Sequence, residues 1–246
     1  MKALAFVPVL LFVVGALAQE KIPAGTILPV ELNSSVRSNK VRSGESISGR
    51  IMQDVPLGGN EKIRAGSKVI GKIVRVRPVG PNAPAEVTVR FDTLVTRKRI
   101  LPIKTSLRAM ASMMDVDEAQ VPKTGPDRGT PEYYWTTEQI GGDTVYHGGG
   151  AVTHGSSVVG KSVANGVLVN VSAEGSEPCQ SDVNDHGPKA LWLFSTDACG
   201  LYGFPDLKVL HAGRTPPAGE IQLQSNKGDI NIRSGSGLLL RVRDAK

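Results

Sequence analysis

The chain has 246 residues, of which 29 are Lys or Arg and 23 are Asp or Glu, so its formal net charge is +6 at pH 7. Its basic residues are scattered and not concentrated on one helix or tract, and we therefore expect no nucleic-acid partner. With 28 glycines and 16 prolines spread throughout, and few windows of helical apolar periodicity, the composition excludes a mostly helical fold.

Residues 1–18 have the pattern of a cleavable secretory signal. Met1-Lys2 is a short basic start, Ala3 to Leu17 is almost wholly apolar, and Ala16-Leu17-Ala18 supplies the small residues that a signal peptidase prefers. The apolar run is about 16 residues, shorter than the roughly 18 to 20 of a spanning helix, which favours cleavage over a membrane anchor. We therefore expect an exported protein of the periplasm, the outer envelope or the extracellular space, with no transmembrane helix after signal cleavage.

Short β-branched runs separated by Gly, Pro or Asn predict an all-β domain, either barrel-like or a sandwich. The expected strands are Thr26–Leu32, Ser46–Met52, Lys68–Val76, Glu86–Val95, Ile100–Thr105, Gly166–Ser172 and Leu191–Ser195. A C-terminal hairpin is also predicted, because apolar residues alternate with polar ones on both sides of the turn Asn226–Asp229. Its four apolar residues are Ile221, Leu223, Ile230 and Ile232.

One pattern occurs three times: Ile, any residue, a small residue, Gly, Ser or Thr, any residue, and an aliphatic residue. The copies span residues 22–28, 63–69 and 232–238, and their glycines are Gly25, Gly66 and Gly235. A glycine before a strand permits a turn with positive φ that redirects the chain into a sheet. We therefore predict one barrel-like sheet that uses this corner three times and contains both ends of the exported chain. Chance similarity of short glycine turns is the alternative.

The predicted organisation places a β-barrel-like domain at residues 19–113 plus 219–246. Residues 114–130 are rich in Asp, Glu and Pro and are expected to be a linker. Residues 131–218 are expected to be a β-rich insertion, in which a short strand at Thr144–His147 is bracketed by glycines.

The chain has two cysteines, Cys179 and Cys199, both in the predicted insertion. In an exported chain an even pair is expected to form a disulfide. The bond would close a loop of about 20 residues, worth roughly 3 kcal/mol on the chain-entropy model. A metal site is the rival interpretation, but it needs further ligands, and Cys-x-x-Cys spacing is absent.

No catalytic motif is complete, so we predict no catalytic residue, metal or cofactor. His147–Gly150 is similar to an esterase oxyanion loop, but the chain has no Gly-x-Ser-x-Gly nucleophile elbow. Its histidines and two nearby acids could assemble a metal site, yet their spacing is not typical of one, and exposed loop histidines are expected. These residues are His147, His154, His186, His211, Asp182 and Asp185.

Two groups of side chains could bind a partner. The first, Arg97-Lys98-Arg99, lies at a predicted hairpin tip and could contact an anionic surface. The strand residues Arg75, Arg77 and Arg90 have the same possible role. The alternative for both sets is protection of sheet edges against aggregation.

The second group is aromatic. Exposed aromatic rings stack on sugars, and Tyr133-Tyr134-Trp135 could form such a platform. Trp192 lies in an apolar run between the cysteines and is expected in the core beside the disulfide.

The corner at Ile22–Thr26 with its strand to Leu32, the corner at Ile63–Ser67, and the final Ile232–Ser236 with its apolar strand carry a family resemblance. Through them, residues 22–105 and 230–243 resemble the C-terminal β-barrel domain of TrbI-type conjugation proteins, the scaffold component of bacterial type IV secretion. The resemblance implies a barrel that acts in envelope assembly. The chain departs from the family in its cleavable signal and in residues 114–218, which have no counterpart there. The chain also resembles uncharacterised secreted envelope proteins of soil bacteria.

These features predict a secreted or periplasmic non-enzymatic envelope protein that acts by binding or assembly. Its expected partners are other envelope proteins or a surface polymer, and an oligomer is compatible with the sequence. Two alternatives stay open: a carbohydrate-binding module with Trp135, Tyr133 and Tyr134 as its platform, and a secreted hydrolase or metalloenzyme.

Overall fold

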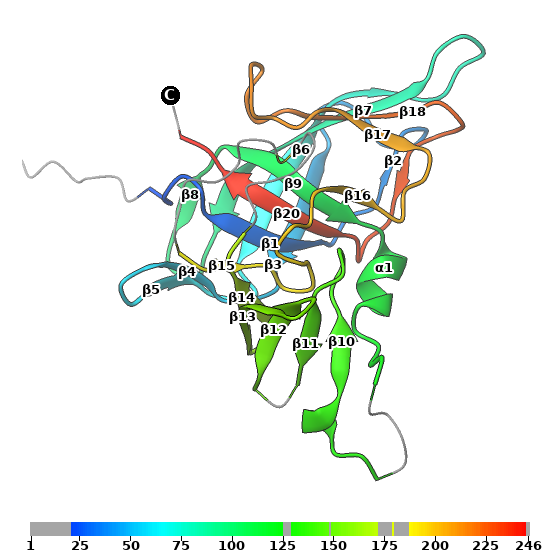
Figure 1. Ribbon diagram of the computed structural model, residues 1–246. Helices are drawn as coiled ribbons and strands as arrows, with labels where there is room; N and C mark the ends of the chain where they lie inside the picture. The colour runs from blue at the N-terminus through cyan, green and yellow to red at the C-terminus, as the bar shows by residue number, and fades with distance from the viewer. Residues whose placement is uncertain (1–20, 125–128, 148, 172–178, 180–186, 245–246) are drawn as a thin grey trace, which may run out of the picture.

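The computed structural model describes residues 21–124, 129–147, 149–171, 179 and 187–244 (Figure 1). The predicted signal at 1–18 lies outside these residues, as do His186, Asp182 and Asp185. The all-β prediction is confirmed: a large barrel-like sheet and a smaller sheet are accompanied by one short α-helix, α1 (Met113–Glu118), and one 3-10 turn, η1 (Glu132–Tyr134). In the described part of the chain, no helix has the length and apolar character to cross a membrane.

The large sheet has the order β16-β9-β20-β1-β3-β6-β7-β18-β17, with β8 also paired to β7. Its strands are β1 (Ile27–Leu32), β3 (Ser46–Ile51), β6 (Lys68–Arg77), β7 (Ala85–Val95), β8 (Ile100–Pro102), β9 (Thr105–Ala111), β16 (Gly200–Tyr202), β17 (Leu207–His211), β18 (Ile221–Ser225) and β20 (Gly237–Val242). The end strands β16 and β17 contact each other, so the sheet is nearly closed. Register shifts in the long β6–β7 pair bend the ribbon, as closure requires.

The two ends of the described chain are neighbours in this sheet. β1 pairs antiparallel with β20, and Leu28 lies opposite Leu240. Gly25 N donates to Val242 O at 2.9 Å at one end of the pair, and Gly235 N donates to Leu32 O at 2.8 Å at the other. The first and third glycine corners therefore flank the β1–β20 pair.

All three corner glycines have a backbone that favours glycine. The φ angles of Gly25, Gly66 and Gly235 are 88°, 84° and 89°. Gly66 N donates to Ile51 O at 2.7 Å, so the second corner joins the end of β3 to the start of β6. The repeated pattern thus marks three turns of one sheet.

The wall of the barrel is buried on both its inner and its outer face where the smaller sheet covers it. On β20, Leu238 and Leu240 point into the barrel core, whereas Leu239 belongs to a second core outside the barrel wall. Ile27 of β1 and Ala109 of β9 join Leu239 there. A strand buried on both faces has a continuous apolar run, which explains the three consecutive leucines of β20.

The smaller sheet is formed by the strands β10 to β15 and lies below the barrel in Figure 1. Its strands are β10 (Thr136–Glu138), β11 (Thr144–Tyr146), β12 (Ala151–His154), β13 (Ser157–Val163), β14 (Gly166–Val169) and β15 (Lys189–Ala190). The predicted short strand between glycine turns is β11. Two strands within the predicted insertion, 131–218, belong to the large sheet: β16 pairs in parallel with β9, and β17 pairs with β18.

The predicted hairpin at 221–233 is wrong. β18 pairs with β7 and β17, whereas β19 (Asn231–Ile232) pairs with β2 (Val36–Arg37). The turn residue Asp229 is held elsewhere, since its Oδ1 accepts from Ser38 Oγ at 2.7 Å and from Val79 N at 3.0 Å. The four apolar side chains of the predicted hairpin still share the barrel core.

Two local predictions also need correction. Leu191–Ser195 is a buried turn and not a strand: Phe194 N donates to Leu191 O at 2.9 Å, and Trp192 has a φ of 54°. A short apolar run has the same periodicity whether it forms a strand or a buried turn. The start of the predicted linker is α1, which begins where Ser112 Oγ accepts from Asp115 N at 3.2 Å, an N-cap contact.

Candidate functional site

A pocket of about 870 Å³ opens at the end of the barrel where β1 begins. Its walls come from three separate segments: Lys21–Pro23, the β4–β5 hairpin with the following corner, and the β7–β8 turn. β4 (Val55–Gly58) and β5 (Glu61–Ile63) pair antiparallel. In Figure 1, β4, β5 and β8 lie at one end of the barrel and β2 lies at the other.

We call this the cationic pocket, because six basic and only two acidic side chains line it, for a net charge of +4. The basic residues are Lys21, Lys62, Arg64, Arg97, Lys98 and Arg99, and the acidic residues are Asp54 and Glu61. Sequence reasoning selected Arg97-Lys98-Arg99 and missed the others. Nothing in the local sequence marks them, since the fold alone brings the three segments together.

The β7–β8 turn presents its basic residues at a hairpin tip, as predicted. Val95 pairs with Ile100, and Thr96 N donates to Arg99 O at 2.8 Å. The hydroxyl Thr96 Oγ1 also accepts from Arg99 N at 3.1 Å. These bonds close a tight turn, so the exposed side chains of Arg97 and Lys98 project from a fixed backbone.

Asp54 orients the other basic wall. Its Oδ2 lies 2.5 Å from Lys62 Nζ and 3.5 Å from Arg64 Nη1, and its Oδ1 accepts from Ala65 N at 2.9 Å. The hydrogen bond from Lys62, followed by that from the Ala65 amide, lowers the pKa of Asp54 below its ordinary value. Asp54 therefore stays ionised at neutral pH and holds two of the six cations in place.

The chemistry of the cationic pocket is that of anion binding. Within the described residues, Lys21, Arg97 and Lys98 form no ion pair with an acidic side chain, so their charge is available to a ligand. Ile22, Leu57 and Leu101 supply an apolar part of the lining. Converging cations next to low-dielectric walls raise the local concentration of anions.

A second pocket, the interface pocket, has a volume of about 850 Å³ and lies between the barrel and the smaller sheet. Barrel residues Arg50–Met52 form one side, and β11, β13 and β14 form the other. Exposed His147 and Asn165 are at its lining, together with the edge of the buried turn at Trp192. Of the histidines that were weighed as possible metal ligands, His147 therefore contributes to a pocket, whereas His154 and His211 line neither the interface pocket nor the cationic pocket.

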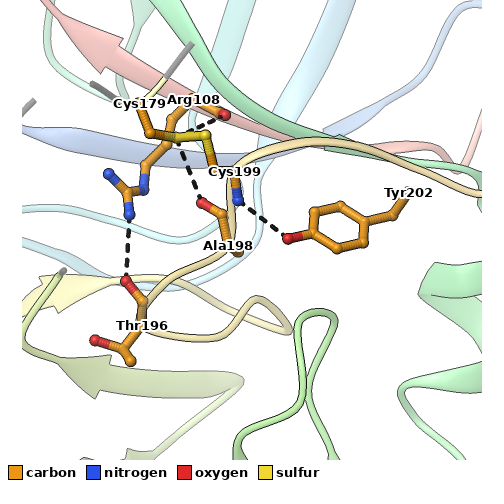
Figure 2. The surroundings of a disulfide bond; sticks show 6 residues. All are labelled: Arg108, Cys179, Thr196, Ala198, Cys199 and Tyr202. Atoms are coloured by element: carbon orange, nitrogen blue, oxygen red, sulfur yellow. Dashed lines mark hydrogen bonds between the residues drawn. A yellow bond between two sulfur atoms is a disulfide. The ribbon is translucent and has the colours of Figure 1, made fainter. Parts of the chain in front are cut away.

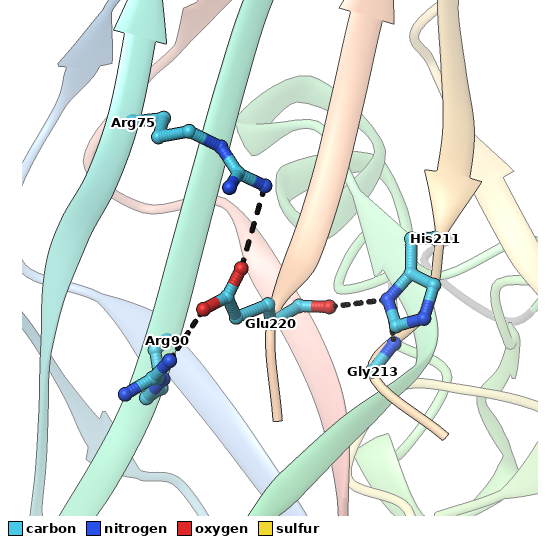
Figure 3. Close-up of polar contacts among 5 residues, drawn as sticks. All are labelled: Arg75, Arg90, His211, Gly213 and Glu220. Carbon is cyan, nitrogen blue, oxygen red and sulfur yellow. Dashed lines mark hydrogen bonds and ion pairs between the residues drawn. The ribbon is translucent and has the colours of Figure 1, made fainter. Parts of the chain in front are cut away.

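The strand arginines form internal ion pairs (Figure 3). Glu220 accepts from Arg75 Nη2 at 3.4 Å through Oε2 and pairs with Arg90 through Oε1. Its backbone oxygen lies 2.7 Å from His211 Nδ1, and the same ring nitrogen lies 3.1 Å from Gly213 N. Arg77 pairs with Glu86 at 2.6 Å. The structure therefore gives these arginines intramolecular partners, and they do not line either pocket.

One group of described residues has a donor set that a metal ion could use: Asp143, His154 and Asp197. His154 Nδ1 lies 2.8 Å from Asp143 Oδ1, and Thr196 N donates to Asp143 Oδ2 at 2.7 Å. The hydrogen bond to Asp143 raises the pKa of His154 above its ordinary value. The same contacts describe an ion pair that joins β12 to the residue before β11, and the Thr196 amide connects this pair to the turn after Leu191. They assign no reaction to the group.

The predicted disulfide between Cys179 and Cys199 is confirmed (Figure 2). Cys179 Sγ lies 3.3 Å from the carbonyl oxygen of Arg108 in β9, and the buried Arg108 side chain donates to Thr196 O at 3.2 Å. Cys199 N donates to Tyr202 Oη at 3.1 Å, and burial raises the pKa of this tyrosine. The disulfide therefore lies against the barrel wall, where β16 joins β9.

The structure describes only part of the predicted aromatic platform. Tyr134 is 60% exposed, Trp135 is half-buried and its Nε1 donates to Thr130 O at 3.2 Å, and the Tyr133 side chain lies outside what the structure describes. Tyr134 and Trp135 line neither pocket. Trp192 is 5% exposed and lies in the second core outside the barrel wall, so its predicted burial is confirmed.

Comparison with known proteins gave no match among family models, curated proteins or solved structures.

Proposed function

We propose that this chain is an exported, non-enzymatic envelope protein that binds an anionic surface polymer through the cationic pocket of its barrel. The observation that carries the proposal is the convergence of six basic side chains from three distant segments on one pocket of net charge +4. Such a convergence needs the folded barrel, and three of these cations form no internal ion pair in the described chain.

A polymer fits this arrangement better than a small anion does. The cations lie on different walls of an open pocket, so one small anion contacts few of them. A chain of regularly spaced negative groups contacts several at once, and each further contact benefits from the effective concentration that the first provides. The TrbI-type resemblance, with its scaffold role in secretion, stays a prediction that is compatible with a barrel acting by binding.

Binding to a polyanion tests the proposal. Dextran sulfate and uncharged dextran of equal length serve as probes in titration calorimetry with the purified chain. We expect dextran sulfate to bind, and we expect the triple variant Lys21→Gln, Arg97→Gln and Lys98→Gln to bind at least about tenfold more weakly.

The matched control removes the same charge elsewhere. Arg37, Lys40 and Lys208 are exposed, and the described ion pairs include none of them. Their triple substitution by Gln should leave the affinity close to that of the parent chain. Equal losses in the two triple variants, or no binding of dextran sulfate to the parent chain, would overturn the proposal.

A further inference from the structure

The two pockets share a wall. Ala65 lines both of them, Arg64 and Ser67 line the cationic pocket, and Gly66 lines the interface pocket. The second glycine corner, Ile63–Ser67, therefore forms a ridge with a pocket on either side. A long ligand that occupies the cationic pocket reaches the interface pocket by crossing this ridge.

The interface pocket differs in charge from its neighbour. Arg50 is its one formally charged lining residue, apart from the titratable His147, and Arg50 Nη2 already donates to Glu31 Oε1 at 2.9 Å. The other polar side chains are mainly neutral amides and hydroxyls, from Gln120, Thr137, Gln139, Ser162 and Asn165. This pocket therefore suits the uncharged, hydroxyl-bearing part of a ligand and gives little attraction to an anion.

Its apolar lining suits the carbon faces of sugar rings. Ile51 and Met52 contribute from the barrel side, and Val145 and Val163 contribute from the smaller sheet. Pockets that combine apolar walls with a few placed polar groups bind ligands through both kinds of surface.

The backbone of Asn165 is fixed by the fold. It lies in the two-residue turn between β13 and β14, where Val163 pairs with Gly166, and its φ is 64°. Gly166 packs so closely on the barrel that a Cβ there would lie 2.3 Å from Gln53 Oε1. A polar side chain on a fixed backbone loses less conformational freedom on binding than one on a mobile loop, which favours affinity.

From these observations, and resting on the function proposed above, we propose that the polymer is an acidic polysaccharide whose chain crosses the Ile63–Ser67 ridge. Its negative groups occupy the cationic pocket, and sugar rings occupy the interface pocket. A polyanion without sugar rings, such as linear polyphosphate, uses the cationic pocket alone.

The test compares oligogalacturonates of increasing length with linear polyphosphate on the purified chain. The variant Asn165→Gly with Gln120→Ala removes two amides from the interface pocket, and glycine keeps the positive φ that residue 165 requires. The matched control is Asn231→Ala with Gln222→Ala, outside both pockets. We expect the first variant to bind long oligogalacturonates about tenfold more weakly and to bind polyphosphate as the parent chain does.

The outcomes separate the two proposals. If the parent chain binds polyphosphate and oligogalacturonate with the same dependence on charge, and the Asn165→Gly variant binds both normally, the polysaccharide proposal is wrong and the cationic pocket stands. If the affinity of the variant falls equally for both ligands, the interface pocket does not recognise sugar rings and the proposal also fails. If the triple variant of the cationic pocket binds both ligands normally, the proposed function itself fails.

Discussion

The side-chain amide of Gln53 pairs with both backbone groups of Val167. Gln53 Nε2 donates to Val167 O at 2.7 Å, and Gln53 Oε1 accepts from Val167 N at 3.2 Å. The same oxygen accepts from Trp192 N at 2.7 Å. One fully buried side chain after β3 thus acts toward β14 as a strand backbone would, and it fixes the smaller sheet to the barrel beside the interface pocket.

Substitution of Gln53 by Ala should weaken this attachment. It leaves the buried backbone amides of Val167 and Trp192 without this partner, whereas Val167 O keeps the hydrogen bond from Leu191 N at 3.2 Å. We expect the free energy of unfolding to fall by about 3 kcal/mol. Urea denaturation measures the loss of stability. The substitution should accelerate amide hydrogen exchange more in β14 than in β3. Gln222→Ala, on the half-buried face of β18, is the control and should cost less than about 1 kcal/mol. Uniform acceleration of exchange across both sheets would contradict the local attachment.

The disulfide should stabilise the chain by restricting its unfolded state. The bond closes a loop with a sequence separation of 20, for which the chain-entropy model gives about 3 kcal/mol. We expect the double variant Cys179→Ser, Cys199→Ser to have a lower free energy of unfolding by about that amount. Reductant should lower the Tm of the parent chain and leave that of the double variant unchanged. If full reduction left the Tm of the parent chain unchanged, this role of the disulfide would be contradicted.

Gly66 offers a test of the corner that separates the pockets. Its φ is 84°, and a Cβ there would meet no atom within 4 Å, so Gly66→Ala adds backbone strain without a clash. We expect a loss of about 1 kcal/mol in the free energy of unfolding. Gly228→Ala is the control, because a Cβ there is equally free and its φ lies outside the positive range. Equal effects of the two substitutions in denaturation would show that strain at the corner is not the cause.

The ion pair between Asp143 and His154 should make stability depend on pH. Asp143 raises the pKa of His154 above the ordinary 6.5. A raised pKa in the folded state means that the pair stabilises fully below the unfolded pKa and loses this contribution as the pH rises through the folded pKa. The stability difference between the parent chain and His154→Gln should therefore be larger at pH 5.5 than at pH 8.5.

The control for this comparison is His147→Gln, since the described contacts give His147 no carboxylate partner. Its stability difference from the parent chain should change less between the two pH values. A difference for His154→Gln that grows toward alkaline pH would have the wrong sign for the proposed pair.

The sequence predicted the parts of the fold that depend on local pattern. Positive φ at Gly25, Gly66 and Gly235 follows from small residues around a glycine before a strand, and the pairing of β1 with β20 agrees with the joined ends. The wrong hairpin at 221–233 had an equally good local pattern. It failed because Asp229 bonds to Ser38 and Val79, far away in sequence, and periodicity carries no information about strand partners.

The candidate site also contains some residues that a local sequence pattern marks and others that only the fold brings together. The run Arg97-Lys98-Arg99 is visible in the sequence, whereas Lys21 and Arg64 join it only through the fold. Gln53 lies between Met52 and Asp54, and nothing in the local sequence distinguishes it from an exposed glutamine. The sequence around Asp143 likewise does not indicate its contact with His154, because the pairing of strands in the smaller sheet brings the two residues together. Contacts between distant segments decide the site, and a single sequence does not encode them as a pattern.

The salt dependence of polyanion binding tests the central claim most directly. The slope of the logarithm of the dextran sulfate affinity against the logarithm of salt concentration reports how many cations contact the polymer. We predict that replacing Lys21, Arg97 and Lys98 by Gln makes this slope clearly shallower, while replacing Arg37, Lys40 and Lys208 by Gln leaves it unchanged. Parallel slopes for all three proteins would contradict the assignment of the cationic pocket as the binding site.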